Sequence, residues 1–298
     1  MNSSPSLFGS LRRQFHARLQ QTIWGTTKEN VPSNADKDSK ASVRIAGYML
    51  EETQERISRA FAQTSGKIFT EATLEFLSGT FSQLEHIRPG PWKFSVSQAS
   101  IGIAAFHQYE HLATLEKLLE ELEKSNSDSS LKNLRAMFAG GYLITPDIVI
   151  AREPISDEAI NGNGKYILAS EEKIAAYTPL RKVNSQTPIL HASISCKWTL
   201  RSDRAQNART EALNLIRNRK GNTPHIVVVT GEPLPSRLSS LALGTGDIDC
   251  VYHMALFELE AAINKSRDKD ETSAEMFDTL VQGRRLRDIS DLPFDLVI

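Results

Sequence analysis

Apolar residues recur three and four positions apart along the first part of the chain, which is the spacing of one face of an α-helix. They predict helices over about 48–63, 68–84 and 103–124. A short N-terminal tail followed by a surface helix is expected before them. The segment 30–42 is rich in turn-forming residues and is predicted to be a loop. The first 124 residues are therefore expected to be mainly helical.

Beyond residue 140 the pattern changes to that of β-strands. Strands are predicted over 142–150, 189–200 and 225–230, and a helix over about 203–218. The run 225–230 is uniformly apolar, as in a strand buried on both faces. Strand–helix–strand order around such a strand predicts an α/β fold, with a central mixed β-sheet flanked by helices.

The Ser/Asn/Asp run at 125–130 marks the best internal boundary of the chain. We expect a single domain over 1–298, with a helical part at about 10–124 and a catalytic sheet and recognition part at about 135–298. A length of 298 residues is sufficient for such a domain with a sizeable core.

Composition excludes several classes of protein. A hydrophobic content of 40% is too high for a largely disordered chain, and no apolar run approaches the roughly 20 residues that cross a bilayer. The net charge of −1 means that any nucleic-acid binding depends on a local basic patch. Two cysteines, Cys196 and Cys250, argue against a disulfide framework and fit a reducing cytoplasm. The basic residues in 1–28 loosely resemble a transit peptide, but a surface helix is the simpler interpretation.

Two charges occur where the pattern predicts burial. Asp147 follows Pro146 within an apolar strand, and alternation places Lys197 on the polar face of the strand 189–200. Burying either charge alone costs several kcal/mol, so each needs a partner. A structural Asp–Lys ion pair and a pair of catalytic groups both satisfy this requirement.

The helix predicted over about 203–218 supports the catalytic interpretation of these two charges. Arg204, Ala208, Glu211 and Leu215 fall on one stripe, which turns Glu211 toward the sheet. Two carboxylates can ligate Mg²⁺ and position a water for attack on a phosphodiester, while a lysine steadies the nucleophile or the charge that develops on phosphorus. This is a Pro-Asp … Lys nuclease pattern in which Ser195 stands where an acid normally precedes the lysine by two positions, and Glu211 replaces that acid.

The turn that follows the strand 189–200 indicates DNA binding. Arg201 and Arg204 can pair bidentately with guanine, and Asp203 can accept a hydrogen bond from cytosine. The stretch 201–220 holds six basic residues against two acidic ones, which makes a local patch in a neutral protein. An N-capping Asp203 flanked by solvent-facing arginines is the non-functional alternative.

These residues resemble a known family. The segment from Ser193 to Glu211 closely resembles the active-site and recognition segment of the NgoMIV family of type II restriction endonucleases, within the PD-(D/E)XK nucleases. The resemblance covers nearly the whole chain and includes Val31-Pro-Ser-Asn-Ala-Asp36, Gln63-Thr-Ser-Gly66, His86-Ile-Arg-Pro-Gly90, Ile144-Thr-Pro-Asp147, Pro235-Ser-Arg237, Leu243-Gly-Thr-Gly246 and Asp288-Ile-Ser-Asp-Leu-Pro293.

The resemblance implies a Mg²⁺-dependent endonuclease that cuts double-stranded 5′-GCCGGC-3′ after the first G and leaves four-base 5′ overhangs. It implies a homodimer that assembles into a homotetramer. Its implied catalytic residues are Asp147, Lys197 and Glu211, with the backbone carbonyl of Cys196 as a further metal ligand. The implied DNA-binding residues are Arg201, Asp203 and Arg204 for the central CCGG, Asp36 and Arg237 for the outer pair, Gln63 for the minor groove, and Ser195.

One position departs from the family pattern. The family places a glutamate directly after the phenylalanine of Gly-x-x-Phe, whereas Phe69 is followed here by Thr70 and then Glu71. A one-residue step turns a helical side chain by about 100°. Either Glu71 or Glu75 fills this role after a local shift, or the role is absent; we carry Glu71 forward as the candidate.

Other functions remain as alternatives. A DNA-binding protein without catalysis and a repair or recombination nuclease fit the same core, although the base-reading cluster argues against the latter. His107-Gln-Tyr-Glu-His111 matches a five-residue zinc-protease pattern but lacks a third ligand. Gly244-Thr-Gly246 lacks the third glycine of a dinucleotide loop, which makes an oxidoreductase the most distant alternative.

Overall fold

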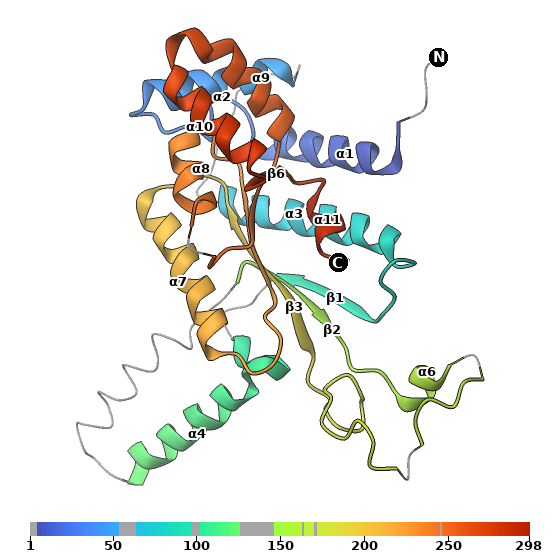
Figure 1. The fold of residues 1–298 in the computed structure, drawn as a ribbon. Helices are drawn as coiled ribbons and strands as arrows, with labels where there is room; N and C mark the ends of the chain where they lie inside the picture. The colour runs from blue at the N-terminus through green and yellow to red at the C-terminus, as the bar shows by residue number, and fades with distance from the viewer. Residues whose placement is uncertain are drawn as a thin grey trace. The chain divides into compact units, whose positions relative to one another are not determined.

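The computed structural model describes residues 5–53, 64–96, 102–125, 146–162, 164–169, 172–244 and 246–298. Within these residues, six strands form a mixed sheet in the order β1-β2-β3-β4-β5-β6, and helices flank it (Figure 1). The predicted α/β class is therefore confirmed. The strands are β1 (Trp92–Val96), β2 (Ile148–Arg152), β3 (Ile189–Lys197), β4 (His225–Thr230), β5 (Cys250–His253) and β6 (Leu286–Asp288).

The chain divides into two compact units. The first contains Met1–Arg88, Ile194–Ala212 and His225–Ile298, and the second contains Pro89–Ser193 and Leu213–Pro224. The first unit holds α1 (Leu7–Thr22), α2 (Lys40–Glu52), α3 (Ser65–Phe81), α8 (Pro235–Ala242), α9 (Leu256–Ser266), α10 (Glu271–Gln282) and α11 (Leu292–Asp295). The second holds α4 (Glu110–Ser125) and α6 (Asp157–Asn161), and α7 (Ser202–Asn218) begins in the first unit and ends in the second.

The first unit has a parallel arrangement of strands. β4 pairs parallel with β5, and β5 pairs parallel with β6. Parallel neighbours need long crossover connections, which α8 supplies between β4 and β5, and α9 with α10 between β5 and β6. β4 is buried along nearly its whole length, in agreement with its uniformly apolar sequence. Helix α1 packs on α3, and α2 packs on α9 (Figure 1).

The second unit contains an antiparallel pair. β1 runs antiparallel to β2, with Trp92 opposite Arg152 and Val96 opposite Ile148. Gln108 ties the turn before α4 to β3, because its side chain donates to the Leu190 carbonyl (2.7 Å) and accepts from the Leu190 N–H (2.9 Å). Short 3₁₀ turns cover Ile103–Ala105 and His107–Tyr109.

Several predicted boundaries were wrong, each for a local reason. The helix expected at 48–63 begins at Lys40, where the side chain of Ser39 accepts the N–H of Ser42 as an N-cap, and residues 54–63 lie outside the described part. The helix expected at 103–124 becomes regular only at Glu110, because Phe106 adopts an extended backbone. Within the described residues, the strand expected at 142–150 begins after Asp147, since Pro146 has no N–H for a ladder.

Among the described residues, no helix is long and apolar enough to cross a membrane.

Candidate functional site

The end of β3 places Lys197 at a fixed position in the first unit. The Lys197 carbonyl accepts hydrogen bonds from the Thr230 hydroxyl (2.7 Å) and the Gly231 N–H (3.3 Å), where β4 ends. Lys197 is half-buried, while Ser195 and Cys196 just before it are buried. The backbone that carries Lys197 and the Cys196 carbonyl is therefore fastened to the centre of the sheet.

The two predicted carboxylates lie on different elements. Glu211 is half-buried on α7, beside the buried Ala208 and Ala212. Asp147 is half-buried in the second unit and directly precedes β2. All three residues take part in further interactions within the fold.

These groups fit a magnesium ion by their chemistry. Two carboxylates and the backbone carbonyl of Cys196 are hard oxygen donors, and Mg²⁺ is usually held by one or two carboxylates together with water. Among the described residues, no three His, Cys, Asp or Glu side chains gather in a way that could hold a metal ion.

Asp36 and Arg237 form the centre of a second group. The Arg237 guanidinium donates a hydrogen bond to the Asp36 carboxylate, although 201 positions separate the two residues. The loop that carries Asp36 is held by the buried Asn34, which donates to the Gly231 carbonyl (2.8 Å), and by the Ser33 carbonyl, which accepts from the Trp198 indole (3.1 Å). The loop is thus attached to the same strand ends that position Lys197.

A pocket of about 680 Å³ lies beside this ion pair. Among the described side chains, three arginines line it, one from α8, one from α7 and one from the residue just before α7. Its lining comprises Asp36, Asp38, Leu200, Arg201, Ala205, Gln206, Arg209, Ser236, Arg237 and Ser240. Positive charge with flanking carboxylates in a polar hollow suits a ligand that carries both anionic groups and hydrogen-bonding edges.

The two carboxylates next to Arg237 have opposite electrostatic environments. The hydrogen bond from Arg237 holds the pKa of Asp36 below its usual value. Glu232 is fully buried, and burial raises its pKa to about 7 against the opposing effects of hydrogen bonds and Arg237. The arginine therefore lies between one carboxylate that ionises readily and one that does not.

The remaining predicted base-reading residues are only partly described. Arg201 is exposed at the rim of the pocket, immediately before α7. Asp203 and Arg204 fall in the first turn of α7, and their side chains lie outside the described part of the chain, as does Gln63.

Thr70 and Glu71 face different surroundings on α3. Thr70 is buried and donates its hydroxyl to the Gly66 carbonyl (3.0 Å). The Glu71 side chain is 43% exposed and lies 4.0 Å from Arg18 and 3.9 Å from Lys67. The inward position predicted for the family glutamate thus holds a threonine, and the catalytic role of Glu71 stays a prediction.

Sequence reasoning missed two polar residues of this site. Glu232 follows the buried strand β4 by two positions, and a carboxylate so close to a buried strand was an available signal. Arg209 on α7 lines the same pocket as Arg201, and it donates to the Ser240 carbonyl (2.5 Å).

The zinc-protease pattern does not gather into a metal cluster within the described residues. Glu110 forms an ion pair with Lys220 (2.5 Å) and lies 3.6 Å from His107. Its hydrogen bond to Lys220 lowers the pKa of Glu110, so the carboxylate serves a surface pair.

Comparison with known proteins decides the family. The model of the NgoMIV restriction enzyme family matches residues 15–298. The type II restriction enzyme NgoMIV of Neisseria gonorrhoeae is 46% identical over 297 residues, which cover 98% of this chain and 99% of that protein. The chain belongs to the NgoMIV restriction enzyme family.

Membership confirms the predicted enzyme class. This member of the NgoMIV family is a type II restriction endonuclease, a site-specific deoxyribonuclease whose partner is double-stranded DNA. The pocket beside Asp36 and Arg237, the end of β3 and the part of α7 up to Ala212 belong to the first unit and carry Lys197, Glu211 and the predicted readers Arg201, Asp203 and Arg204. The predicted catalytic residue Asp147 belongs to the second unit.

Proposed function

We propose that this restriction enzyme hydrolyses 5′-GCCGGC-3′ after the first G, in a Mg²⁺-dependent reaction that leaves four-base 5′ overhangs. The observation that carries the specificity is the ion pair between Asp36 and Arg237 beside a pocket lined by further arginines. Arginine reads guanine O6 and N7, and aspartate accepts from the cytosine amino group. Because the two side chains touch, they can contact the two bases of one G·C pair, which is the outer pair of the site.

The central four base pairs are assigned to the residues at the start of α7. In this proposal Arg201, Asp203 and Arg204 read CCGG, and Gln63 contacts the minor groove. Arg201 supports it by its exposed position at the rim of the pocket that holds Arg237. Ser195 is assigned to the DNA-contacting set on the evidence of family resemblance.

Hydrolysis is assigned to the groups around the end of β3. Asp147, Glu211 and the Cys196 carbonyl would hold Mg²⁺, which when bound supplies Lewis-acid stabilisation of the charge that develops on the phosphate. The Lys197 ammonium orients the attacking water and offsets negative charge on the scissile group. Glu71 is proposed as an additional catalytic carboxylate on α3.

The proposed assembly is a homodimer that pairs into a homotetramer. A two-fold axis in the dimer matches a palindromic site, so that each subunit reads one half and cuts one strand. We place the enzyme in the cytoplasm, and both of its cysteines are buried.

Digestion of plasmid DNA with Mg²⁺, followed by run-off sequencing of the ends, tests the proposal. Cleavage confined to GCCGGC, with breaks after the first G, is the expected result. Cleavage at a wider set of CCGG sites would remove the outer-pair assignment of Asp36 and Arg237 while leaving the enzyme class intact. Specific binding without cleavage would contradict the catalytic assignment.

A further inference from the structure

Glu232 connects two parts of the recognition surface. It follows β4 by two residues, and its side chain is fully buried. One carboxylate oxygen accepts the N–H of Leu200 (2.7 Å), and the other accepts the N–H of Leu234 (3.2 Å). Leu200 immediately precedes Arg201, so Glu232 fixes the backbone from which the central-site reader extends.

The same carboxylate also faces Arg237. The distance between its Oε2 and the Arg237 Nη1 is 3.7 Å, while Nη2 of the arginine donates to Asp36. The guanidinium is therefore held from two sides, by a buried carboxylate behind it and by a carboxylate that lines the pocket in front of it.

We propose that Glu232 is a positioning residue for sequence specificity. It holds Arg237 in its base-reading orientation and fixes the position of Arg237 relative to the segment that begins at Leu200. This inference rests on the proposed reading of the outer pair by Asp36 and Arg237. Glu232 itself cannot touch a base, because its side chain has no exposed surface. It acts through Arg237 and through the Leu200 backbone.

The contact with Glu232 matters for specificity because it persists when DNA enters the pocket. Arg237 and Asp36 must exchange their mutual hydrogen bond for base edges, which frees one side of the guanidinium. The ion pair with Glu232 remains, because the bases cannot reach a fully buried carboxylate. An arginine that keeps one fixed partner loses less orientational freedom and discriminates better between base pairs.

The charge of Glu232 depends on its surroundings. Burial raises its pKa to about 7, while Arg237 on α8 favours the ionised form and Asp36 before α2 opposes it. On β5, burial lowers the pKa of His253 to about 4, so this imidazole is neutral near Glu232. The ion pair with Arg237 is therefore complete above neutral pH and weakens as pH falls below about 7.

The test measures kcat/KM on three short duplexes with Glu232→Gln. One duplex carries GCCGGC, the second has its outer pairs replaced around an intact CCGG, and the third has one central pair replaced. Glutamine keeps an acceptor for the Leu200 N–H but removes the charge facing Arg237. We expect discrimination against the outer replacement to fall at least about tenfold, with discrimination against the central replacement retained.

Two controls separate positioning from a general structural role. Glu275→Gln removes an exposed carboxylate from α10, outside the pocket, and is expected to leave the discrimination ratios unchanged. Glutamine keeps an acceptor for the Leu200 N–H but turns an amide NH2, which cannot accept, toward the Leu234 N–H. The unfolding midpoint of Glu232→Gln should therefore fall modestly, and a loss of outer-pair discrimination with central-pair discrimination retained separates positioning from this general loss of stability.

The pH dependence of discrimination in the wild-type enzyme is a further test that does not depend on a variant folding. Discrimination against the outer replacement should decline as pH falls from 8 to 6, while discrimination against the central replacement stays constant. In Glu232→Gln the first ratio should no longer change with pH. A wild-type ratio that is constant over this range overturns the inference, even if the variant does not fold.

Arg237→Ala distinguishes failure of this inference from failure of the proposed function. If Arg237→Ala loses outer-pair discrimination and Glu232→Gln keeps it, Glu232 has no positioning role. If Arg237→Ala keeps outer-pair discrimination, the outer-pair assignment is wrong, and the role of Glu232 falls with it. Loss in both variants, with the pH behaviour above, supports both.

Discussion

At the scale of single residues, Arg237 illustrates how surroundings determine the behaviour of identical groups. Asp36 and Glu232 both carry a carboxylate directed at this arginine. Asp36 lines an open pocket and keeps a pKa below its usual value, because Arg237 donates a hydrogen bond to it. Glu232 has no solvent exposure, and desolvation raises its pKa to about 7 despite the same arginine. Desolvation thus exceeds the attraction of a partner at 3.7 Å.

Asp147→Ala tests the proposed metal ligands. Removing this carboxylate should abolish Mg²⁺-dependent cleavage, because the remaining oxygen donors are too few to hold the ion firmly. Binding to a GCCGGC duplex should persist, since the base-reading residues are separate. Single-turnover cleavage and gel-shift assays measure the two properties. The exposed Asp268→Asn serves as a matched control, and retained cleavage in Asp147→Ala would remove Asp147 from the mechanism.

The catalytic role proposed for Glu71 can be tested against Glu75, which lies one turn further along α3. Glu71 and Glu75 on α3 both form ion pairs with Arg18, and the Glu75 side chain is 70% exposed. If Glu71 is catalytic, Glu71→Gln should slow cleavage at least about tenfold, while Glu75→Gln should have no effect. Equal rates in both variants would show that Glu71 is only a surface partner of Arg18.

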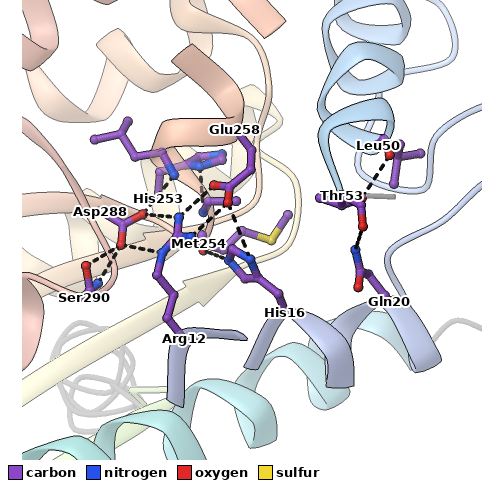
Figure 2. Close-up of polar contacts among 12 residues, drawn as sticks. Arg12, His16, Gln20, Leu50, Thr53, His253, Met254, Glu258, Asp288 and Ser290 are labelled. Atoms are coloured by element: carbon purple, nitrogen blue, oxygen red, sulfur yellow. Dashed lines mark hydrogen bonds and ion pairs between the residues drawn. The ribbon is translucent and has the colours of Figure 1, made fainter. Parts of the chain in front are cut away.

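At the scale of elements, the N-terminal helix is anchored by a buried charge network. Figure 2 shows Arg12 of α1 between Glu258 of α9 and Asp288 of β6, with His16 close to Glu258. Arg12 donates to Glu258 at 2.9 and 2.7 Å and to Asp288 at 3.0 and 2.8 Å. The Asp288 side chain is 1% exposed. Helix α1 is therefore attached to the C-terminal part of the first unit by a doubly bidentate arginine.

Arg12→Met should destabilise the enzyme by about 3–5 kcal/mol, because it leaves buried carboxylates without their partner. Chemical denaturation of the dilute enzyme measures the change. Arg13→Met is the matched control, since the Arg13 guanidinium is exposed and donates to the Ser10 hydroxyl (3.2 Å). Equal stability of the two variants would contradict a structural role for the network.

The same network predicts a pH dependence of stability. Burial alone would raise the pKa of Asp288, but hydrogen bonds from Arg12 and Ser290 outweigh it and hold the pKa below the ordinary value of 3.8. The stability that this group contributes is therefore present above pH 4 and is lost as pH falls through the lowered pKa. We expect the free energy of unfolding of the wild type to drop more steeply below pH 4 than that of Arg12→Met.

The loop before α2 depends on one buried amide. Asn34 is fully buried and donates to the Gly231 carbonyl (2.8 Å), two residues before Asp36. Asn34→Ala should cost about 1–3 kcal/mol of stability, because a buried carbonyl loses its donor. It should also weaken outer-pair discrimination by displacing Asp36, whereas discrimination at the central pairs should remain. Duplex cleavage and denaturation measure both effects, and an unaffected outer-pair ratio would show that the loop is held without Asn34.

At the scale of the whole molecule, the proposed assembly is tested by sedimentation. We expect the enzyme to sediment as a tetramer of 33.2 kDa chains and to cut plasmids with two GCCGGC sites faster than plasmids with one. Chelation of divalent ions should stop cleavage without dissociating the tetramer. A dimer with equal rates on both plasmids would contradict the tetramer.

The sequence predicted best those features that are encoded in a continuous stretch of residues. Periodicity located α3, α7 and β4 closely, because each element has a continuous apolar pattern. The contiguous segment around Lys197 and Arg201 carried the family resemblance, which the match over residues 15–298 confirms. Short strands such as β5 and β6 escaped prediction, since three or four residues give too little pattern.

The sequence by itself determined the fold class, the enzyme class and the residues proposed for cleavage and base reading. Only the tertiary structure brought Asp36 to Arg237 across 201 positions and placed Glu232 behind that arginine without solvent contact. Hydrophobic periodicity acts over a few residues, so it specifies elements and their buried faces. Which loop meets which strand end is decided by how the elements pack, and burial at that junction sets the charge state of Glu232.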